Sequence, residues 1–218
     1  VQAGALFVNL SRRTQSLVDR QLELIDDLEQ GEEDPARLGN LFTLDNLATR
    51  MRRNGENLLV LGGQDPVRRW DRALPLLDVL RAAISEVEQY ERFDLAAVPP
   101  TYVVSDAVSD VVHLLAELLD NATAFSSKAG RVGVTATGLP GGAALVEITD
   151  RGVGLSEQEC AELNERLESA VEIDANVSRR MGLYVVARLA GRQDVRVRLH
   201  PAQPREVSAT VELPARIL

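Results

Sequence analysis

Apolar residues recur at alternating steps of three and four in the first part of the chain, a spacing that indicates long helices. Two runs have this spacing, at residues 7–28 and 41–58. An acidic segment at 31–34 separates them, and Asp34 followed by Pro35 supplies an N-cap and a first-turn proline for the second helix. The pattern therefore predicts a helical hairpin of about 55 residues.

Both runs match the a and d positions of a coiled coil. These positions hold Phe7, Leu10, Thr14, Leu17, Gln21, Leu24 and Leu28 in the first run, and Leu41, Leu44, Ala48, Met51, Gly55 and Leu58 in the second. A hairpin with a single apolar seam buries little core by itself. We therefore expect it to pair with a second copy as a four-helix bundle. The alternative is a hairpin that packs only on the rest of its own chain.

Glycine and proline at 62–66 indicate a linker, so we predict a hairpin domain at 1–63 and a second domain at 64–218. In the second domain, helical spacing and strand-like alternation follow one another. Helices are expected at 73–90, 113–126, 156–169 and 181–190, and strands at 102–104, 131–137, 144–149, 194–200 and 206–213. This order predicts an α+β fold, with helices on one face of a largely antiparallel sheet.

Composition limits the classes of function. The formal net charge of −9 argues against general binding to nucleic acid or to anionic membranes. Cys160 is the only cysteine, so there is no disulfide framework and no CxxC metal motif, which fits a reducing, cytoplasmic compartment. No apolar run approaches the roughly 18 residues of a membrane span. The chain starts at Val1 and not at methionine, so we expect any membrane attachment to come from a segment outside it.

The helical segment at 113–126 carries the first candidate chemistry. Glu117 and Asn121 are four residues apart and therefore share one helix face. An amide oxygen and a carboxylate placed in this way can ligate a divalent cation and orient a water. Taken alone, such a pair is more often the polar edge of an amphipathic helix.

Two glycine-containing segments follow. Asp150 ends the strand at 144–149, and Gly152 and Gly154 allow the backbone to approach a ligand closely. A carboxylate at this position can accept a hydrogen bond from an exocyclic amine such as that of adenine. The segment 178–183 then opens a helix with Arg179, Arg180 and Gly182, where unpaired N–H groups and guanidinium groups favour phosphate.

In these three segments the chain resembles the N, G1 and G2 boxes of the GHKL superfamily, over residues 74–213. This is the ATP-binding fold shared by histidine kinases, Hsp90, type II topoisomerases and MutL. The resemblance implies that ATP and Mg²⁺ are bound. It assigns Glu117 as the general base or water-polarising residue and Asn121 as the Mg²⁺ ligand.

The same resemblance implies further roles around the nucleotide. Asp150 would bind adenine with support from Thr210, and Gly152 and Gly154 would belong to the nucleotide loop. Gly182, with Arg179 and Arg180, would lie near the phosphates, and residues 156–180 would form the ATP lid. The hairpin would be the dimerisation and phosphotransfer domain of a sensor histidine kinase.

The segments LDNLATRMRRNGENLLVLGG and SRRMGLYVVARLA more narrowly resemble the sensor-kinase-like proteins of actinobacterial conservons. Those proteins are thought to act with a small GTPase and its accessory proteins. A histidine kinase passes phosphate to a histidine in its hairpin, yet His113 and His200 are the only histidines here. Asn46 and Arg12 stand in the two candidate phosphoacceptor positions, both outward in the heptad register. Asparagine cannot replace imidazole as a nucleophile, so autophosphorylation by the usual chemistry is not expected.

Two other departures concern phosphate contacts. Ala124 stands where the family commonly has a basic residue, and the G2 segment has one glycine where two or three are usual. Three hypotheses follow. The favoured one is a dimeric ATP-binding signalling module whose output is conformational. The others are an active ATPase or kinase that acts on a partner, and a scaffold with a vestigial nucleotide site.

Overall fold

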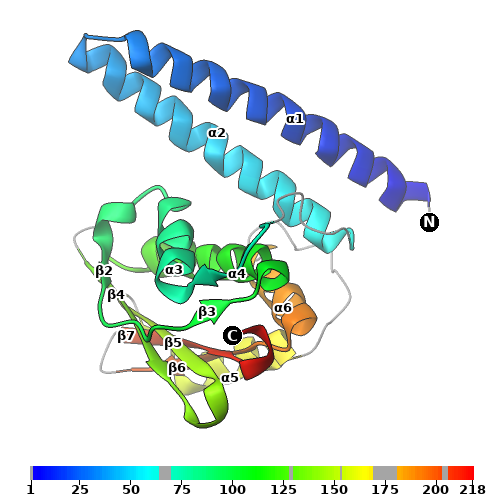
Figure 1. Ribbon diagram of the computed structural model, residues 1–218, viewed down its shortest axis with the longest axis vertical. Coiled ribbons are helices and arrows are strands. Elements are labelled where there is room, and N and C mark those ends of the chain that lie inside the picture. The colour runs from blue at the N-terminus through cyan, green and yellow to red at the C-terminus, as the bar shows by residue number, and fades with distance from the viewer. Residues whose placement is uncertain (1, 64–69, 128–129, 153, 169–180, 203–205) are drawn as a thin grey trace. The chain divides into compact units, whose positions relative to one another are not determined.

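The computed structural model describes residues 2–63, 70–127, 130–152, 154–168, 181–202 and 206–218 (Figure 1). The side chains of residues 2–10 and of Arg12 lie outside this description. The chain divides into two compact units, Val1–Pro66 and Val67–Leu218. The first unit is a helical hairpin and the second is an α/β sandwich, so the predicted α+β class is confirmed.

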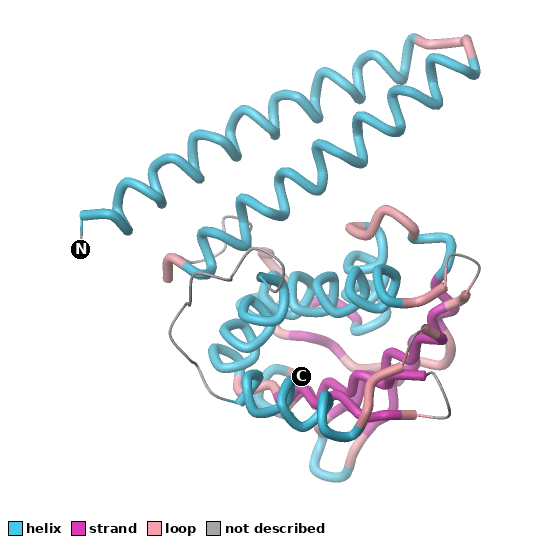
Figure 2. The backbone as a smooth tube through the Cα atoms, turned by 180° about the vertical axis from the view of Figure 1, so that it is seen from behind, coloured by secondary structure: helices cyan, strands magenta, loops and turns pink. Residues whose placement is uncertain are grey.

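The hairpin consists of α1 (Gln2–Gly31) and α2 (Pro35–Leu61), which run antiparallel and lie against each other (Figure 2). The turn between them follows the expected chemistry. Asp34 is the N-cap of α2, and its carboxylate accepts a hydrogen bond from the Ala36 N–H at 2.8 Å. Pro35 then occupies the first helical turn, where its missing N–H costs nothing.

The two helices bury a different stripe of α1 from the one that the heptad pattern predicts. Val18 of α1 and Ala48 of α2 are buried. By contrast, Leu17, Leu24 and Leu28 are exposed by 60%, 56% and 60%. Two helices cover each other along only one side, so most of the predicted seam remains on the surface of the single hairpin.

The second unit alternates helices and strands along the chain. Its helices are α3 (Leu76–Ser85), α4 (Ser105–Phe125), α5 (Glu157–Glu168) and α6 (Met181–Gln193), with 3₁₀ turns η1 (Tyr90–Arg92), η2 (Pro140–Gly142) and η4 (Ala215–Ile217). Its strands are β1 (Leu74–Pro75), β2 (Phe93–Leu95), β3 (Tyr102–Val103), β4 (Val132–Gly138), β5 (Ala144–Arg151), β6 (Arg196–Pro201) and β7 (Glu206–Leu213). The helices and strands expected from the periodicity are present. The short strands β1 and β2 are additional, because two or three residues are too few to show an alternation.

The main sheet has the order β2-β4-β5-β7-β6, and a separate two-stranded sheet pairs β1 with β3. The β2–β4 pair is parallel and the other pairs of the main sheet are antiparallel. The fully buried Val134, Val146 and Val211 face the helical layer, in which α4 and α6 lie side by side (Figure 1). Helix α4 is the central element of the core, since Leu114, Leu115 and most of its other middle residues are buried.

Helix α5 occupies the first half of the segment that the resemblance assigns to an ATP lid. It begins with a capping box, in which the Ser156 hydroxyl accepts from the Glu159 N–H at 3.2 Å and the Glu159 carboxylate accepts from the Ser156 N–H at 2.9 Å. Asn164 then exchanges two hydrogen bonds with the backbone of Leu199, at 2.9 and 2.8 Å. Residues 156–168 are therefore a helix anchored to strand β6, and residues 169–180 lie outside the described part of the chain.

Candidate functional site

Three of the predicted residues meet where α4 and α6 come together. Glu117 is buried, with 6% of its surface exposed, and Asn121 one turn later is partly exposed. Gly182 lies in the first turn of α6, and a Cβ atom added to it would stand 2.5 Å from Glu117 Oε2 and 3.7 Å from Asn121 Nδ2. The absence of a side chain at Gly182 thus allows the start of α6 to approach the carboxylate and the amide.

Asp150 is the last core-facing residue of β5 and is 7% exposed. Burial, and next the nearby negative charge of Glu206, raise the pKa of Asp150 from 3.8 to about 6, while the positive charge of Arg92 lowers it. A carboxylate with a perturbed pKa at the end of a strand is a common feature of functional sites, although structural networks also produce it. The Asp150 side chain is well placed to accept a hydrogen bond from a ligand amine.

The backbone geometry explains why glycine occupies positions 152 and 154. Gly152 forms an isolated bridge with Ser126, and a Cβ atom on it would collide with the Phe125 carbonyl oxygen at the end of α4. Gly154 has a φ of 78°, in the left-handed region that favours glycine. The loop after β5 therefore lies directly against the C-terminal end of α4, which brings Asp150 to the same end of the fold as Asn121.

The structure does not bring Thr210 to this place. Thr210 is directly opposite Glu147 on β5 and Arg198 on β6, and its hydroxyl donates to the Arg198 carbonyl oxygen at 3.2 Å. Successive side chains of a strand point to opposite faces, so Thr210 lies on the outer face and Asp150 on the inner one. The residue paired with Asp150 is Val207. Thr210 matches the family motif by its position in the sequence, but its side chain lies on the opposite face of the sheet from Asp150.

Four predicted residues remain, Arg179, Arg180, Asn46 and Arg12. Arg179 and Arg180 lie outside the described residues. Asn46 belongs to α2 and is only partly exposed, so it is less open than the outward position expected for it. Arg12 belongs to α1, and its side chain is outside the description.

Sequence reasoning missed Arg92, which the structure bonds to the end of α4 and to the residues that follow it. Its guanidinium donates to the Thr123 carbonyl oxygen at 3.2 Å and to the Gly130 carbonyl oxygen at 2.8 Å. It lies close enough to Asp150 to lower the pKa of that carboxyl. Nothing in the periodicity around 90–95 marks this arginine, because its acceptors are more than thirty residues away in the chain.

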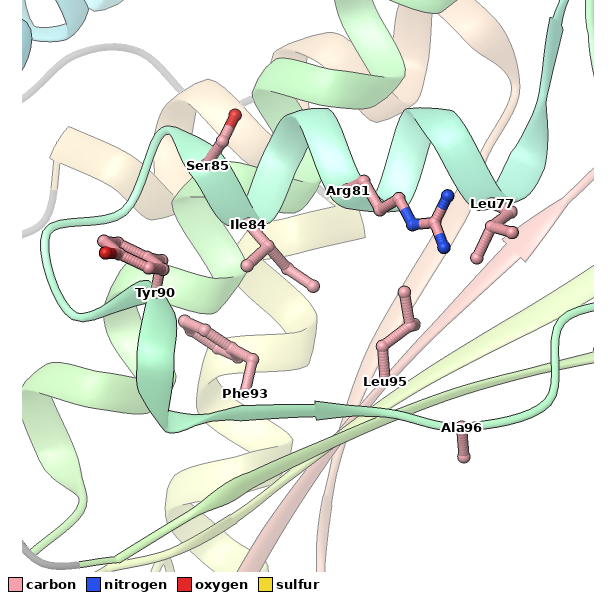
Figure 3. Close-up of a pocket in the computed structure, with 8 residues that line it drawn as sticks. All are labelled: Leu77, Arg81, Ile84, Ser85, Tyr90, Phe93, Leu95 and Ala96. Carbon is pink, nitrogen blue, oxygen red and sulfur yellow. The ribbon is translucent and has the colours of Figure 1, made fainter.

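A groove is present on another part of the surface. A groove with a volume of about 730 Å³ lies between α3 and β2. Figure 3 shows Phe93 and Leu95 of β2 pointing toward α3 across it, with Tyr90 at one end and Arg81 on the α3 side. Among the predicted site residues that the structure describes, none lines this groove. Tyr90 and Phe93, which line the groove, lie on either side of Arg92 in the sequence. Arg92 in turn bonds to the end of α4.

The whole arrangement falls within one recognised sequence family. The family model described as "Histidine kinase-, DNA gyrase B-, and HSP90-like ATPase" matches residues 106–217, just over half of the 218-residue chain. The chain belongs to this ATPase family. The matched region includes all but the first residue of α4, as well as Asp150, Gly182 and β7. No curated protein matches the chain.

Solved structures of histidine kinases share the fold of this ATPase-family chain. Full-length ShkA, crystallised in complex with AMPPNP, superposes with a TM-score of 0.59 at 18% identity and covers 96% of this chain. The match spans 45% of ShkA, so the chain corresponds to less than half of that protein.

Two other kinases are similar over most of their own length. The Acinetobacter baumannii histidine kinase AdeS gives a TM-score of 0.53 at 17% identity, covering 93% of this chain and 96% of its own. The mycobacterial sensor histidine kinase MprB gives a TM-score of 0.53 at 25% identity and covers 67% of this chain and 98% of its own. At 17% and 18% identity, AdeS and ShkA support the fold alone.

Proposed function

We propose that this chain is an ATP-binding, sensor-histidine-kinase-like signalling protein. The observation that carries the proposal is the meeting of Glu117 and Asn121 on α4 with Gly182 at the start of α6, inside the domain matched by the family. Asp150 at the end of β5 adds a buried carboxylate for the adenine amine. In this arrangement the nucleotide would lie between the C-terminal end of α4 and the start of α6. ShkA, a structural neighbour, binds AMPPNP, which agrees with this class of ligand.

A magnesium ion fits the site only together with the nucleotide. Among the described residues, no three His, Cys, Asp or Glu side chains are grouped so that they could hold a metal by themselves. Mg²⁺ is commonly bound by one or two protein oxygens together with substrate phosphates. Asn121 would supply the protein oxygen, and the buried Glu117 would orient a water or accept its proton.

The exposed stripe on the hairpin supports a homodimer. Leu17, Leu24 and Leu28 on α1, with Leu44 and Met51 on α2, are at least half exposed in the single chain. Apolar side chains at heptad spacing on both helices are typical of a four-helix bundle formed by two hairpins. We infer that a second copy covers them.

The hairpin has no histidine to receive phosphate, because residues 1–112 contain none. The candidate positions hold Asn46 and Arg12, neither of which can act as the usual nucleophile. We infer that the output is conformational: ATP would favour one arrangement of α6 and the segment before it, and a partner would recognise that arrangement. The conservon resemblance suggests a small GTPase and its accessory proteins as partners, in the cytoplasm. The structure adds that no helix among the described residues has the length and apolar character of a membrane span.

A second function is chemically open. Glu117 and Asn121 are both present, and together they supply the groups that a slow ATPase, or a kinase that modifies a partner, requires. The single glycine of the G2 segment and Ala124 favour instead a weak or vestigial site.

Isothermal titration with ATP, with and without Mg²⁺, tests the proposal. We expect Mg²⁺-dependent binding by the wild type that is roughly ten- to hundredfold weaker in Asp150→Asn. If the wild type binds no nucleotide at millimolar concentration, the proposal is wrong and the scaffold hypothesis is favoured. Label from γ-phosphate-labelled ATP that appears on the chain or on a partner, and is lost in Glu117→Ala, would favour the active enzyme.

A further inference from the structure

Arg92, the last residue of η1, uses every N–H of its guanidinium. An arginine side chain has five such donors in a planar fork. The acceptors are the Gly130 carbonyl for Nε, Gln89 Oε1 and the Thr123 carbonyl for Nη1, and Ser126 Oγ and the Ser127 carbonyl for Nη2. One side chain thereby ties η1 to the last turn of α4 and to Ser126, Ser127 and Gly130 beyond it.

The acceptors explain why a guanidinium occupies this position. The last carbonyl groups of a helix have no partner within the helix and lie at the negative end of its dipole. Thr123 is in the last turn of α4, and its carbonyl oxygen accepts from Arg92 at 3.2 Å. Lysine has three donors on a single nitrogen and cannot reach acceptors spread over so wide an arc.

The segment held by Arg92 is also the segment that touches the candidate site. Ser126 forms the isolated bridge to Gly152, two residues beyond Asp150. Asn121 lies two residues before Thr123, whose carbonyl oxygen Arg92 binds. The distance between Asn121 on α4 and Asp150 on β5 therefore depends on the hydrogen bonds that Arg92 makes to Thr123, Ser126, Ser127 and Gly130. We call this set of contacts the joint.

We propose that Arg92 is a positioning residue of the nucleotide site. It holds the C-terminal end of α4, together with Ser126, Ser127 and Gly130, against β5, so that Asn121 and Asp150 keep the separation that one nucleotide spans. This inference rests on the proposed nucleotide binding. It adds a residue that touches neither phosphate nor adenine in the proposed arrangement and acts through α4 and the loop.

Removing the charge of Arg92 and merely loosening the fold should shift the pKa of Asp150 in opposite directions, and this difference provides the test. The charged groups acting on Asp150 are Glu206 from β7 and Arg92 from η1, and Glu206 is itself paired with Arg151 at 3.0 Å. Removing the charge of Arg92 must therefore raise the pKa of Asp150 further. A substitution that merely loosened the fold would expose Asp150 to water and lower that pKa.

The experiment uses the full chain as wild type, Arg92→Gln, Arg92→Lys and Arg131→Gln. Arg131 is the matched control, because it is an exposed arginine whose guanidinium pairs with Asp94 of β2. Two quantities are measured: ATP affinity by calorimetry, and the Asp150 carboxyl titration by carbon-detected NMR without nucleotide. Hydrogen exchange at residues 123–127 and 130 reports on the joint itself.

We expect Arg92→Gln to weaken ATP binding at least tenfold, to raise the pKa of Asp150 and to speed exchange at the joint. Arg92→Lys should retain the Asp150 titration but weaken ATP binding, because the charge remains while the fork is lost. Arg131→Gln should match the wild type in all three. Unchanged exchange and an unchanged Asp150 titration in Arg92→Gln would overturn the inference.

The two proposals fail in different ways. If the wild type binds no ATP, the proposed function fails, and with it the nucleotide-positioning role, whatever the joint does. If the wild type binds ATP and Arg92→Gln binds it equally well, only the role of Arg92 fails. If Arg92→Gln does not fold, the lysine variant decides, since wild-type affinity in Arg92→Lys would also overturn the inference.

Discussion

The buried carboxylate of Asp150 should make the nucleotide-free domain less stable at neutral pH, and Asp150→Asn removes that cost. A folded-state pKa of about 6, in place of the usual 3.8, corresponds to about 3 kcal/mol disfavouring the charged form. Residual solvent screening reduces this to about 2 kcal/mol. We therefore expect Asp150→Asn to be more stable than the wild type at pH 7.5, while its ATP affinity falls roughly ten- to hundredfold because a charge-assisted hydrogen bond is lost.

The pH dependence gives the prediction its direction. Because the pKa of Asp150 is raised on folding, the folded wild type binds this proton more tightly than the unfolded chain between pH 4 and pH 6. Wild-type stability from this group therefore falls as the pH rises through that window. The advantage of Asp150→Asn should be largest above pH 7 and should disappear near pH 4, where the wild-type carboxyl is protonated.

The assay is differential scanning calorimetry of both proteins without nucleotide, from pH 4 to pH 8. About 2 kcal/mol in a chain of this size corresponds to roughly 4–8 °C in Tm. Asp94→Asn is the control, because the Asp94 carboxylate bonds to Arg131 and its pKa is lowered, so its loss should not stabilise the protein. A stability difference for Asp150→Asn that is absent, or that stays constant from pH 5 to pH 8, would refute the reasoning.

Three further predictions concern other parts of the chain. Gly182→Ala places a Cβ atom against the Glu117 carboxylate, so we expect ATP affinity to fall about tenfold with less than about 1 kcal/mol lost in stability; calorimetry and urea unfolding separate the two effects. Leu24→Asp with Leu28→Asp puts charges on the exposed stripe of α1 and should turn a dimer into a monomer in light scattering. If the unsubstituted chain is already monomeric, the dimer proposal is wrong. Ser156→Ala removes the capping box of α5 and should cost about 1 kcal/mol in urea unfolding, whereas a neutral result would mean that Asn164 alone holds the helix on β6.

Local signals in the sequence were sufficient for the elements and for part of the site. The hairpin turn follows from Asp34 and Pro35, whose roles involve only neighbouring residues. The helical period alone places Glu117 and Asn121, four residues apart, on one face of α4. Asp150, Gly152 and Gly154 follow a strand whose alternation is visible in the sequence.

Relations between distant segments were decided only by the tertiary structure. Thr210 matched by sequence, yet the register of β5 with β7 pairs Asp150 with Val207 and places Thr210 on the other face. A shift of one residue in a strand reverses the face of every side chain, and single-chain spacing does not fix that register. Arg92 is the clearest case, because the carbonyl groups that it binds in α4 and at Gly130 come from segments remote in sequence. The sequence determined which groups are candidates for binding a nucleotide, whereas long-range packing decided which of them lie close together.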